Sequence, residues 1–242
     1  MTPEIVIDTA EHLAETFTGR FTETAGRAIA ERGLFSVALP GGSVATTFFP
    51  RLAAASVDWS RVAFFWSDER GVPPSHPESN YAAAEQLWLR PAAVPATRIH
   101  RMPADTPDLE GAADAYAEQL VRVLGSPPVL DCALLGMGPD GHVCSLFPGH
   151  LLLDEQRRWV AAIIDSPKPP PRRLTLTLPV LAAARQIVLV ATGAPKAEAV
   201  HGVVMDPGCR LPAAIVMRAA GDRGVLLLDH AAAGRLPGVT QP

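Results

Sequence analysis

The chain of 242 residues has few cysteines, no long apolar run and no block of like charge, and each absence excludes a class of protein. Its three cysteines, Cys132, Cys144 and Cys209, have no C-x-x-C spacing, which argues against a disulfide framework and a zinc knuckle. No stretch of about 18 apolar residues occurs, so no membrane-spanning helix is expected. The formal net charge is −4, without the basic patch that a nucleic acid or an anionic membrane would require.

The remaining composition is that of a folded protein in a reducing compartment. Hydrophobic residues make up 48% of the chain, and at this length a core can form without disulfides or metals. The first residues lack the basic and apolar segments of a leader peptide, so we expect a cytoplasmic protein. We expect no nucleic-acid or membrane partner, and a monomer or a weak homodimer.

Short runs of branched apolar residues alternate with longer segments of helical period, the pattern of β-α units around a parallel sheet. We expect a single α/β domain over residues 1–242, with a doubly wound, largely parallel sheet flanked by helices. The expected strands cover residues 4–8, 34–39, 62–66, 129–135, 159–164, 173–177, 187–191 and 225–228. The expected helices run from a Thr9 cap to Gly33, over 79–89, from a Thr106 cap to Gly125, and over 179–184 and 195–204.

Ligands of such sheets bind at the carboxyl ends of the strands, so the loops that follow strands are the candidate sites. The first loop, 40–43, reads Pro-Gly-Gly-Ser and precedes the segment 44–52. Its glycines allow close backbone approach, and N–H groups at a helix N-terminus can hold a phosphate. A tight turn in which Ser43 caps the helix fits the same residues. The sequence leaves both interpretations open.

Three consecutive charged residues, Asp68, Glu69 and Arg70, follow the expected strand 62–66. Charges at such a position cap a helix, pair with one another or face a substrate. Paired or solvated charge is the more common case, because charge clusters are frequent and sites are few.

The loop 136–142 matches G-x-G-x-x-G but does not fit dinucleotide binding. That fingerprint needs a helix that opens at the third glycine, and Pro148 and Gly149 would break it. We expect instead a loop that presents Asp140 and His142 at the sheet edge. There a neutral imidazole can act as a general base and a nearby carboxylate can orient it. A structural histidine in a turn is the alternative.

Neither a cysteine nucleophile nor a metal site is favoured. The neighbours of Cys144 are largely apolar, which is typical of a small buried residue rather than of a reactive thiol. The seven histidines form no H-x-x-x-H pair. We therefore expect no metal ligands.

Two further segments bring cations to strand or helix ends. The proline-rich segment 166–173 contains Lys168, Arg172 and Arg173, and the segment 193–196 ends in Lys196. Together with the loop 40–43, these cations can complete a phosphate cage. A solvated proline-rich loop is the alternative for the first of them.

These motifs, taken together, resemble the 6-phosphogluconolactonase family. The resemblance runs in order from about residue 30 to 200, through segments 40–43, 67–73, 79–81, 135–149 and 166–177. It implies a cofactor-free, metal-independent esterase that hydrolyses 6-phosphoglucono-1,5-lactone to 6-phosphogluconate in the oxidative pentose phosphate pathway. It also implies a Rossmann-like fold related to glucosamine-6-phosphate deaminase. Two residues depart from the family pattern. Pro40 stands where Ser or Ala is expected, and Cys144 stands where Ala is expected.

The resemblance implies roles for individual residues. His142 would activate water, Asp140 would orient the imidazole, and Arg70 would lie near the developing oxyanion or the phosphate. The expected phosphate ligands are Gly41, Gly42, Ser43, Arg173 and Lys196, with Arg173 favoured over Arg172. The expected further substrate contacts are Asp68 and Gly138.

Three rival functions share parts of this pattern. Glucosamine-6-phosphate deaminases have the same turn and Asp-Gly-His loop, but they continue into Asn-Glu-Pro-Gly, whose glutamate assists ring opening. Here Phe147 stands at the corresponding position and cannot exchange a proton, which favours the lactonase. A dinucleotide-dependent oxidoreductase would need a true glycine fingerprint, and a sugar-phosphate sensor would bind without turnover.

Overall fold

Six of the apolar segments pair side by side as a parallel sheet. The computed structural model describes residues 2–239, and its strand order is β1-β9-β8-β5-β2-β3. These strands are Glu4–Asp8 (β1), Phe35–Leu39 (β2), Val62–Trp66 (β3), Cys132–Gly136 (β5), Ile187–Ala191 (β8) and Gly224–Asp229 (β9). The strands β2, β3 and β8 are buried along their whole length, as expected for a sheet covered on both faces.

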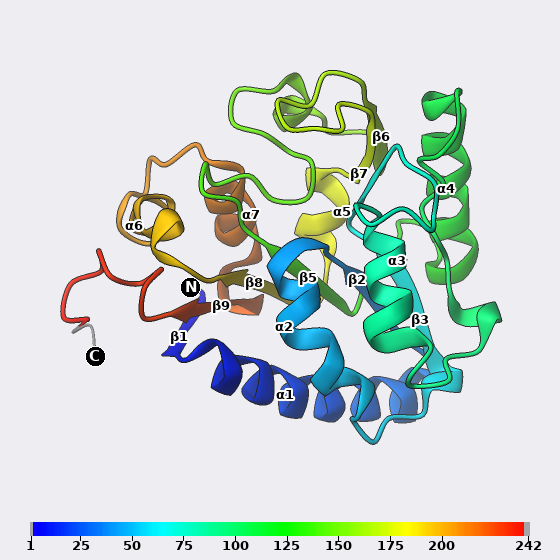
Figure 1. Ribbon diagram of the computed structural model, residues 1–242, viewed down its shortest axis with the longest axis horizontal. Helices are drawn as coiled ribbons and strands as arrows, with labels where there is room; N and C mark the ends of the chain where they lie inside the picture. The colour runs from blue at the N-terminus through cyan, green and yellow to red at the C-terminus, as the bar shows by residue number, and fades with distance from the viewer. Residues whose placement is uncertain (1, 240–242) are drawn as a thin grey trace.

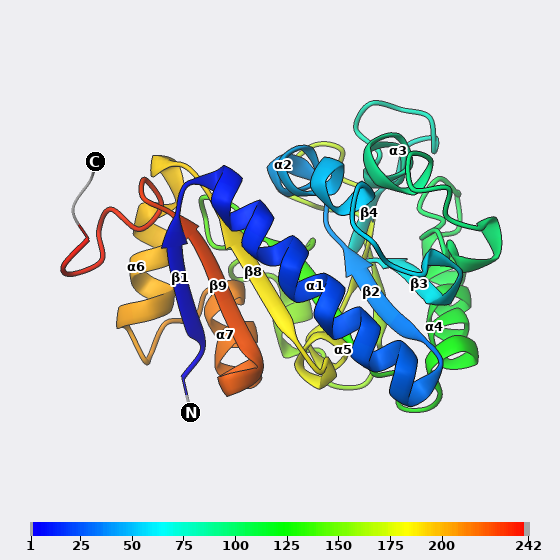
Figure 2. The same cartoon turned by 90° about the horizontal axis from the view of Figure 1, so that it is seen from below.

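Helices cover both faces of this sheet (Figures 1 and 2). In Figure 2, α1 crosses one face, while α5 and α7 lie on the other. The helices are Ala10–Arg32 (α1), Gly42–Ala53 (α2), Asn80–Ala84 (α3), Leu109–Leu124 (α4), Leu178–Ala183 (α5), Ala197–Met205 (α6) and Pro212–Ala220 (α7). The π-helix Glu85–Leu89 (η2) continues α3 directly. The short 3-10 helices are Trp59–Arg61 (η1), Ala96–Arg98 (η3), Leu151–Asp154 (η4), Ala194–Lys196 (η5) and Gly221–Arg223 (η6). The doubly wound α/β class is therefore confirmed.

The first helix shows how local sequence signals set the element bounds. Thr9 accepts a hydrogen bond from the backbone N–H of His12 at 3.3 Å, which caps the start of α1. Gly33 ends the helix with a φ of 79°, a conformation that favours glycine. Between them, Phe17 and Phe21 are buried against the sheet. Both expected ends of this helix are confirmed.

A second, three-stranded antiparallel sheet corrects the expectation of one sheet. Asp68–Arg70 (β4), Arg173–Leu176 (β7) and Val160–Ile163 (β6) pair in the order β4-β7-β6, and α4 packs against β6. The segments 159–164 and 173–177 are strands as expected, but they do not join the parallel sheet. The strand β4 was not expected, because three charged residues carry no apolar alternation.

Two helical expectations also need correction. Helix α4 begins at Leu109 because Asp108, and not Thr106, accepts the hydrogen bond from the Gly111 N–H at 2.9 Å. Helix α7 had no counterpart among the expected elements. Among residues 2–239, no helix is both long and apolar enough to cross a bilayer.

Candidate active site

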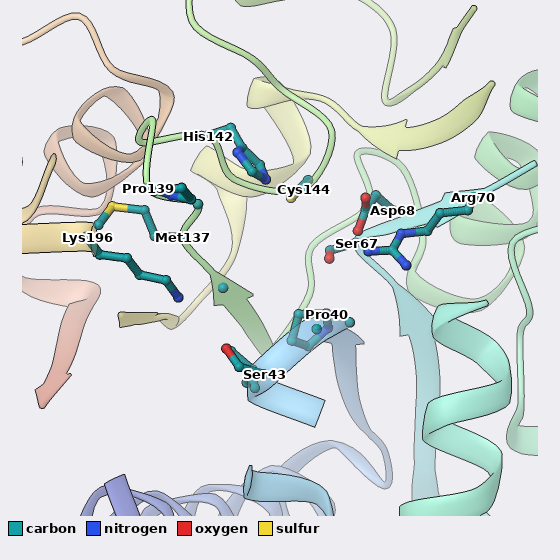
Figure 3. A pocket seen from close by; sticks show the side chains of 15 residues that line it. Pro40, Ser43, Ser67, Asp68, Arg70, Met137, Pro139, His142, Cys144 and Lys196 are labelled. Carbon is teal, nitrogen blue, oxygen red and sulfur yellow. The ribbon is translucent and has the colours of Figure 1, made fainter. Parts of the chain in front are cut away.

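A cavity of about 230 Å³ lies at the carboxyl ends of β2, β3 and β5 (Figure 3). Its walls come from the loops that follow these strands and from η5. Eight of the ten expected site residues line it: Gly41, Gly42, Ser43, Asp68, Arg70, Gly138, His142 and Lys196. Asp140 lies directly behind His142, and Arg173 lies outside the lining. The topology therefore gathers distant segments at the edge where ligands of parallel sheets bind.

The N-terminus of α2 forms the floor of the cavity. Gly41 is its cap residue, and no side chain caps the helix, so the interpretation of Ser43 as the cap is wrong. The N–H groups of the first turn have no partner within the helix and are available to an anion. A Cβ atom at Gly41 would lie 1.7 Å from Oδ1 of Asn80. Only glycine permits this close approach between α2 and α3.

Lys196 brings a positive charge to the same side of the cavity as Ser43 (Figure 3). Burial lowers the pKa of its ammonium group, with Asp229 acting in the opposite direction. Within residues 2–239 no carboxylate lies within ion-pair distance of Lys196. A desolvated ammonium beside uncapped backbone N–H groups suits a phosphate.

The three charges of β4 divide between structure and site because successive side chains of a strand point to opposite sides. Glu69 is buried and accepts hydrogen bonds from the backbone N–H groups of Asn80 and Tyr81 at the start of α3. Burial raises the pKa of Glu69, against these hydrogen bonds. Asp68 and Arg70 line the cavity instead. The charged triplet thus both caps a helix and faces the cavity.

Asp68 is buried and its carboxylate is fully engaged by protein groups. Ser145 donates to Oδ2 at 2.7 Å, and the Asn80 side chain donates to Oδ1 at 3.1 Å. Arg70 has fewer protein partners: one Nη donates to the carbonyl of Glu78, and the buried Nε has no partner in the described part of the chain. Arg70 is therefore the better placed of the two to meet a ligand.

The loop after β5 forms a tight turn around Gly138. The N–H of Gly141 donates to the Gly138 carbonyl at 3.0 Å, and the Gly138 N–H donates to the His142 carbonyl at 2.9 Å. His142 Nδ1 lies 2.5 Å from Asp140 Oδ1. A Cβ atom at Gly138 would lie 2.1 Å from the imidazole, so this glycine makes room for the pair. No helix opens at Gly141, which excludes the dinucleotide fingerprint.

The surroundings of this pair favour a neutral imidazole and an ionised carboxylate. Burial lowers the pKa of His142, and the Asp140 carboxylate opposes this effect. Burial by itself raises the pKa of Asp140, but the hydrogen bond with His142 and the nearby Lys168 ammonium bring it below its usual value. With Nδ1 held by Asp140, the Nε2 atom is left as the proton acceptor.

Arg173, which we expected to bind phosphate, is buried on β7 and does not line the cavity. It donates to the carbonyls of Lys168, Pro169 and Pro170, and to Ser145 Oγ. One Nη also lies 3.7 Å from Asp68 Oδ2. Its neighbour Arg172 donates to the carbonyls at 106 and 107 and does not line the cavity either. Sequence could not distinguish a buried arginine that holds a loop from one that faces a ligand.

Sequence reasoning also missed partners of the site residues. From sequence, Lys168 was one of the cations of the segment 166–173. In the structure it contacts both Asp140 and His142. Asn80 and Ser145 hold Asp68. The rarity of lysine is a signal that could have identified Lys168. Only two of the 21 lysine and arginine residues of the chain are lysines. The second lysine is Lys196, which lines the cavity.

Two other expectations concern nucleophiles and metals. Cys144 lines the cavity, but burial raises the pKa of its thiol well above the usual value, which disfavours a thiolate nucleophile. Among residues 2–239, no group of three histidine, cysteine or acidic side chains is arranged to hold a metal ion.

Comparison with known proteins finds one family over most of the chain. The family model described as "Glucosamine-6-phosphate isomerases/6-phosphogluconolactonase" matches residues 8–225. The probable 6-phosphogluconolactonase 3, chloroplastic, of Oryza sativa subsp. indica is 44% identical over 217 residues; the match covers 84% of this chain but 65% of that relative. The 6-phosphogluconolactonase of Streptomyces coelicolor is 40% identical, with 98% of this chain and 95% of the relative covered.

Solved structures agree with this placement. The 6-phosphogluconolactonase of Trypanosoma brucei superposes with a TM-score of 0.86 at 29% identity, covering 97% of this chain and 99% of that one. A monomeric glucosamine-6-phosphate deaminase superposes with a TM-score of 0.80 at 22% identity, covering 96% and 99%. The second likeness shows the shared fold alone.

Proposed function

Because the chain belongs to the family of glucosamine-6-phosphate isomerases and 6-phosphogluconolactonases, we propose that it hydrolyses 6-phospho-D-glucono-1,5-lactone to 6-phospho-D-gluconate. This is the second step of the oxidative pentose phosphate pathway. The names of the relatives from Oryza sativa and Streptomyces coelicolor support the proposal. We also propose that the reaction needs neither a metal nor a cofactor.

The observation that carries the proposal is the Asp140–His142 pair beside a cationic cavity. A general base is sufficient for a δ-lactone, whose carbonyl is already open to attack by water. A base of this kind contributes about 10²- to 10⁴-fold in rate. The cavity adds orientation, because a phosphate held at one end fixes the position of the ring.

The proposed reaction begins with a water molecule at His142 Nε2. The neutral imidazole takes a proton from this water as its oxygen attacks the lactone carbonyl carbon. The tetrahedral oxyanion is stabilised by Arg70 and by backbone N–H groups. The bond between the carbonyl carbon and the ring oxygen then breaks, and the imidazolium returns its proton to that oxygen. Asp140 orients the imidazole and stabilises its charged form throughout.

The phosphate is proposed to bind between Ser43 and Lys196, over the N-terminus of α2. These two residues lie on one side of the cavity, and Arg70 lies on the other (Figure 3). This arrangement leaves Arg70 for the carbonyl end of the substrate. Phosphate binding by Arg173 is not part of the proposal, since its donors are engaged by protein carbonyls.

Deamination of glucosamine 6-phosphate is the second candidate, because the family includes both activities. Phe147 argues against it: its ring centroid lies 4.9 Å from that of His142, where the deaminase motif supplies a glutamate. A phenyl ring cannot exchange the proton that ring opening requires.

The test is proton release on addition of freshly made 6-phosphoglucono-1,5-lactone in weak buffer containing EDTA, beside ammonia release from glucosamine 6-phosphate. We expect acidification far faster than the blank and no ammonia. A rate equal to the blank would contradict lactonase activity. Ammonia release would assign the deaminase instead.

A further inference from the structure

The proline-rich segment 166–171 carries a lysine that reaches the acid–base pair. Lys168 Nζ lies 3.1 Å from Asp140 Oδ2 and 3.2 Å from Asp140 Oδ1. It also lies 3.2 Å from His142 Nδ1. The ammonium group therefore contacts both carboxylate oxygens and the imidazole edge that the carboxylate holds. Lys168 does not line the cavity, so it is not placed to touch the substrate.

The backbone around Lys168 is fixed by several hydrogen bonds. Ser166 Oγ donates to the Lys168 carbonyl at 2.8 Å and accepts from the Lys168 N–H at 3.2 Å. The buried Arg173 guanidinium donates to the carbonyls of Lys168, Pro169 and Pro170 at 3.0–3.2 Å. A long flexible side chain loses much rotamer entropy when it is held, and a rigid backbone reduces the remaining freedom. The segment thus presents one ammonium group at one place.

Hydrogen-bond chemistry decides how the three groups share their protons. A lysine ammonium can only donate, and an ionised carboxylate can only accept. Because the ionised Asp140 can only accept, the proton of its hydrogen bond with His142 belongs to His142 Nδ1. The ammonium then donates to Asp140, on the carboxylate oxygens that it contacts. This arrangement leaves the imidazole in the tautomer with a free Nε2.

We propose that Lys168 is a positioning residue of the acid–base pair: its ammonium keeps the Asp140 carboxylate ionised and in place, and so holds His142 with Nε2 free toward the cavity. The consequence for catalysis rests on the proposed lactonase function. The placement of Lys168 against Asp140 and His142 does not rest on that function, because it concerns these three side chains alone. Lysine is suited to this role because its compact point charge fits beside two carboxylate oxygens without the planar fork of arginine.

Charged groups on several elements face the His142 imidazole. Burial lowers its pKa most strongly and the Lys168 ammonium lowers it further, whereas Asp140 and Asp68 raise it. The Arg173 guanidinium lies over the Phe147 ring, at 5.9 Å from its centroid, and this ring packs against the imidazole. Removal of the Lys168 charge therefore raises the pKa of His142. The neutral, base-competent form would then be lost at a higher pH than in the wild type.

The experiment compares Lys168→Met with Arg172→Met. Arg172 is a cation of the same stretch that contacts the carbonyls at 106 and 107 and belongs to no part of the site. NMR titration of the His142 ring proton, identified by its absence in His142→Asn, gives the midpoint in each folded protein. Arg70 and Lys196, which line the same cavity, are unchanged in both variants.

For Lys168→Met we expect the titration midpoint, and the acid limb of kcat/KM, to move up by about one pH unit. For Arg172→Met we expect the wild-type midpoint. An unchanged midpoint in Lys168→Met, or an equal shift in Arg172→Met, would overturn the proposal. If the wild type showed no lactone turnover but the midpoint moved as expected, the proposed function would fail and the role of Lys168 would stand.

Discussion

The two sheets of the molecule contribute to the site in different ways. The strand β2 of the large sheet is buried and apolar except for Ser36, and what it delivers to the cavity is mainly backbone: the turn at Gly41 and the first turn of α2. The small sheet buries charge instead. Asp68, Glu69 and Arg173 are each at most 5% exposed, and each is held by several hydrogen bonds.

This difference indicates a division of labour. An apolar sheet stabilises by burial and tolerates changes that conserve volume. A buried polar network is stable only when every member is satisfied, so one substitution disturbs several groups at once. The large sheet therefore provides the phosphate-binding edge and, on the loop after β5, the Asp140–His142 pair. The small sheet and the segments bonded to it hold the side chains that position the chemistry.

The largest expected effect is that of His142→Ala. Removal of the general base should lower kcat about 10²- to 10⁴-fold, since that is the usual contribution of such a group. KM should change little, because the phosphate-binding edge is intact. Steady-state proton release measures both constants. Turnover close to that of the wild type would contradict the assignment of His142 as the base.

Arg173→Met tests the polar network of the small sheet. The substitution leaves Asp68 buried without its nearest cation and releases the carbonyls at 168–170. We expect a loss of about 3 kcal/mol in the free energy of unfolding, measured with urea. Arg172→Met is the matched control and should change it by at most about 0.5 kcal/mol. Equal losses in the two variants would refute the structural role of Arg173.

Gly41→Ala tests the close approach between α2 and α3. The added methyl group would collide with the Asn80 side chain, which holds Asp68, and we expect a cost of about 1–3 kcal/mol. Gly26→Ala in α1 is the control, because nothing lies within 4 Å of its Cβ position. Thermal unfolding should show destabilisation for the first variant and stabilisation for the second. A neutral Gly41→Ala would mean that Asn80 can move away freely.

The smallest expected effect is a change with pH. Lactone hydrolysis should need the neutral form of His142, whose pKa is lowered by burial. The usual pKa of an imidazole is about 6.5. As the pH falls through this value, kcat/KM should therefore stay constant, and it should decline only at lower pH. The pH profile of kcat/KM measures this. A decline that begins above pH of about 6.5 would show that the Asp140 carboxylate outweighs burial.

Most of the large sheet and much of the site could be predicted from sequence. Branched apolar runs indicated its six strands, and the turn at 40–43 and the pair Asp140–His142 stood directly after strands. What failed was the separate pairing of the small sheet: the segments of β6 and β7 were expected as strands, but the charged strand Asp68–Arg70 carries no apolar period. The roles of Arg173 and Lys168 depend on which atoms their side chains reach across antiparallel pairing and loops. Local sequence does not encode such contacts.

The central claim is that the α2 edge binds the phosphate while the Asp140–His142 pair performs the chemistry. Calorimetric measurement of 6-phosphogluconate binding tests it most directly, because it needs no turnover. The account predicts that Lys196→Met raises Kd at least about tenfold, as expected for the loss of one charge-assisted hydrogen bond, and that His142→Ala keeps Kd near the wild-type value. Unchanged binding in Lys196→Met together with lost binding in His142→Ala would contradict it.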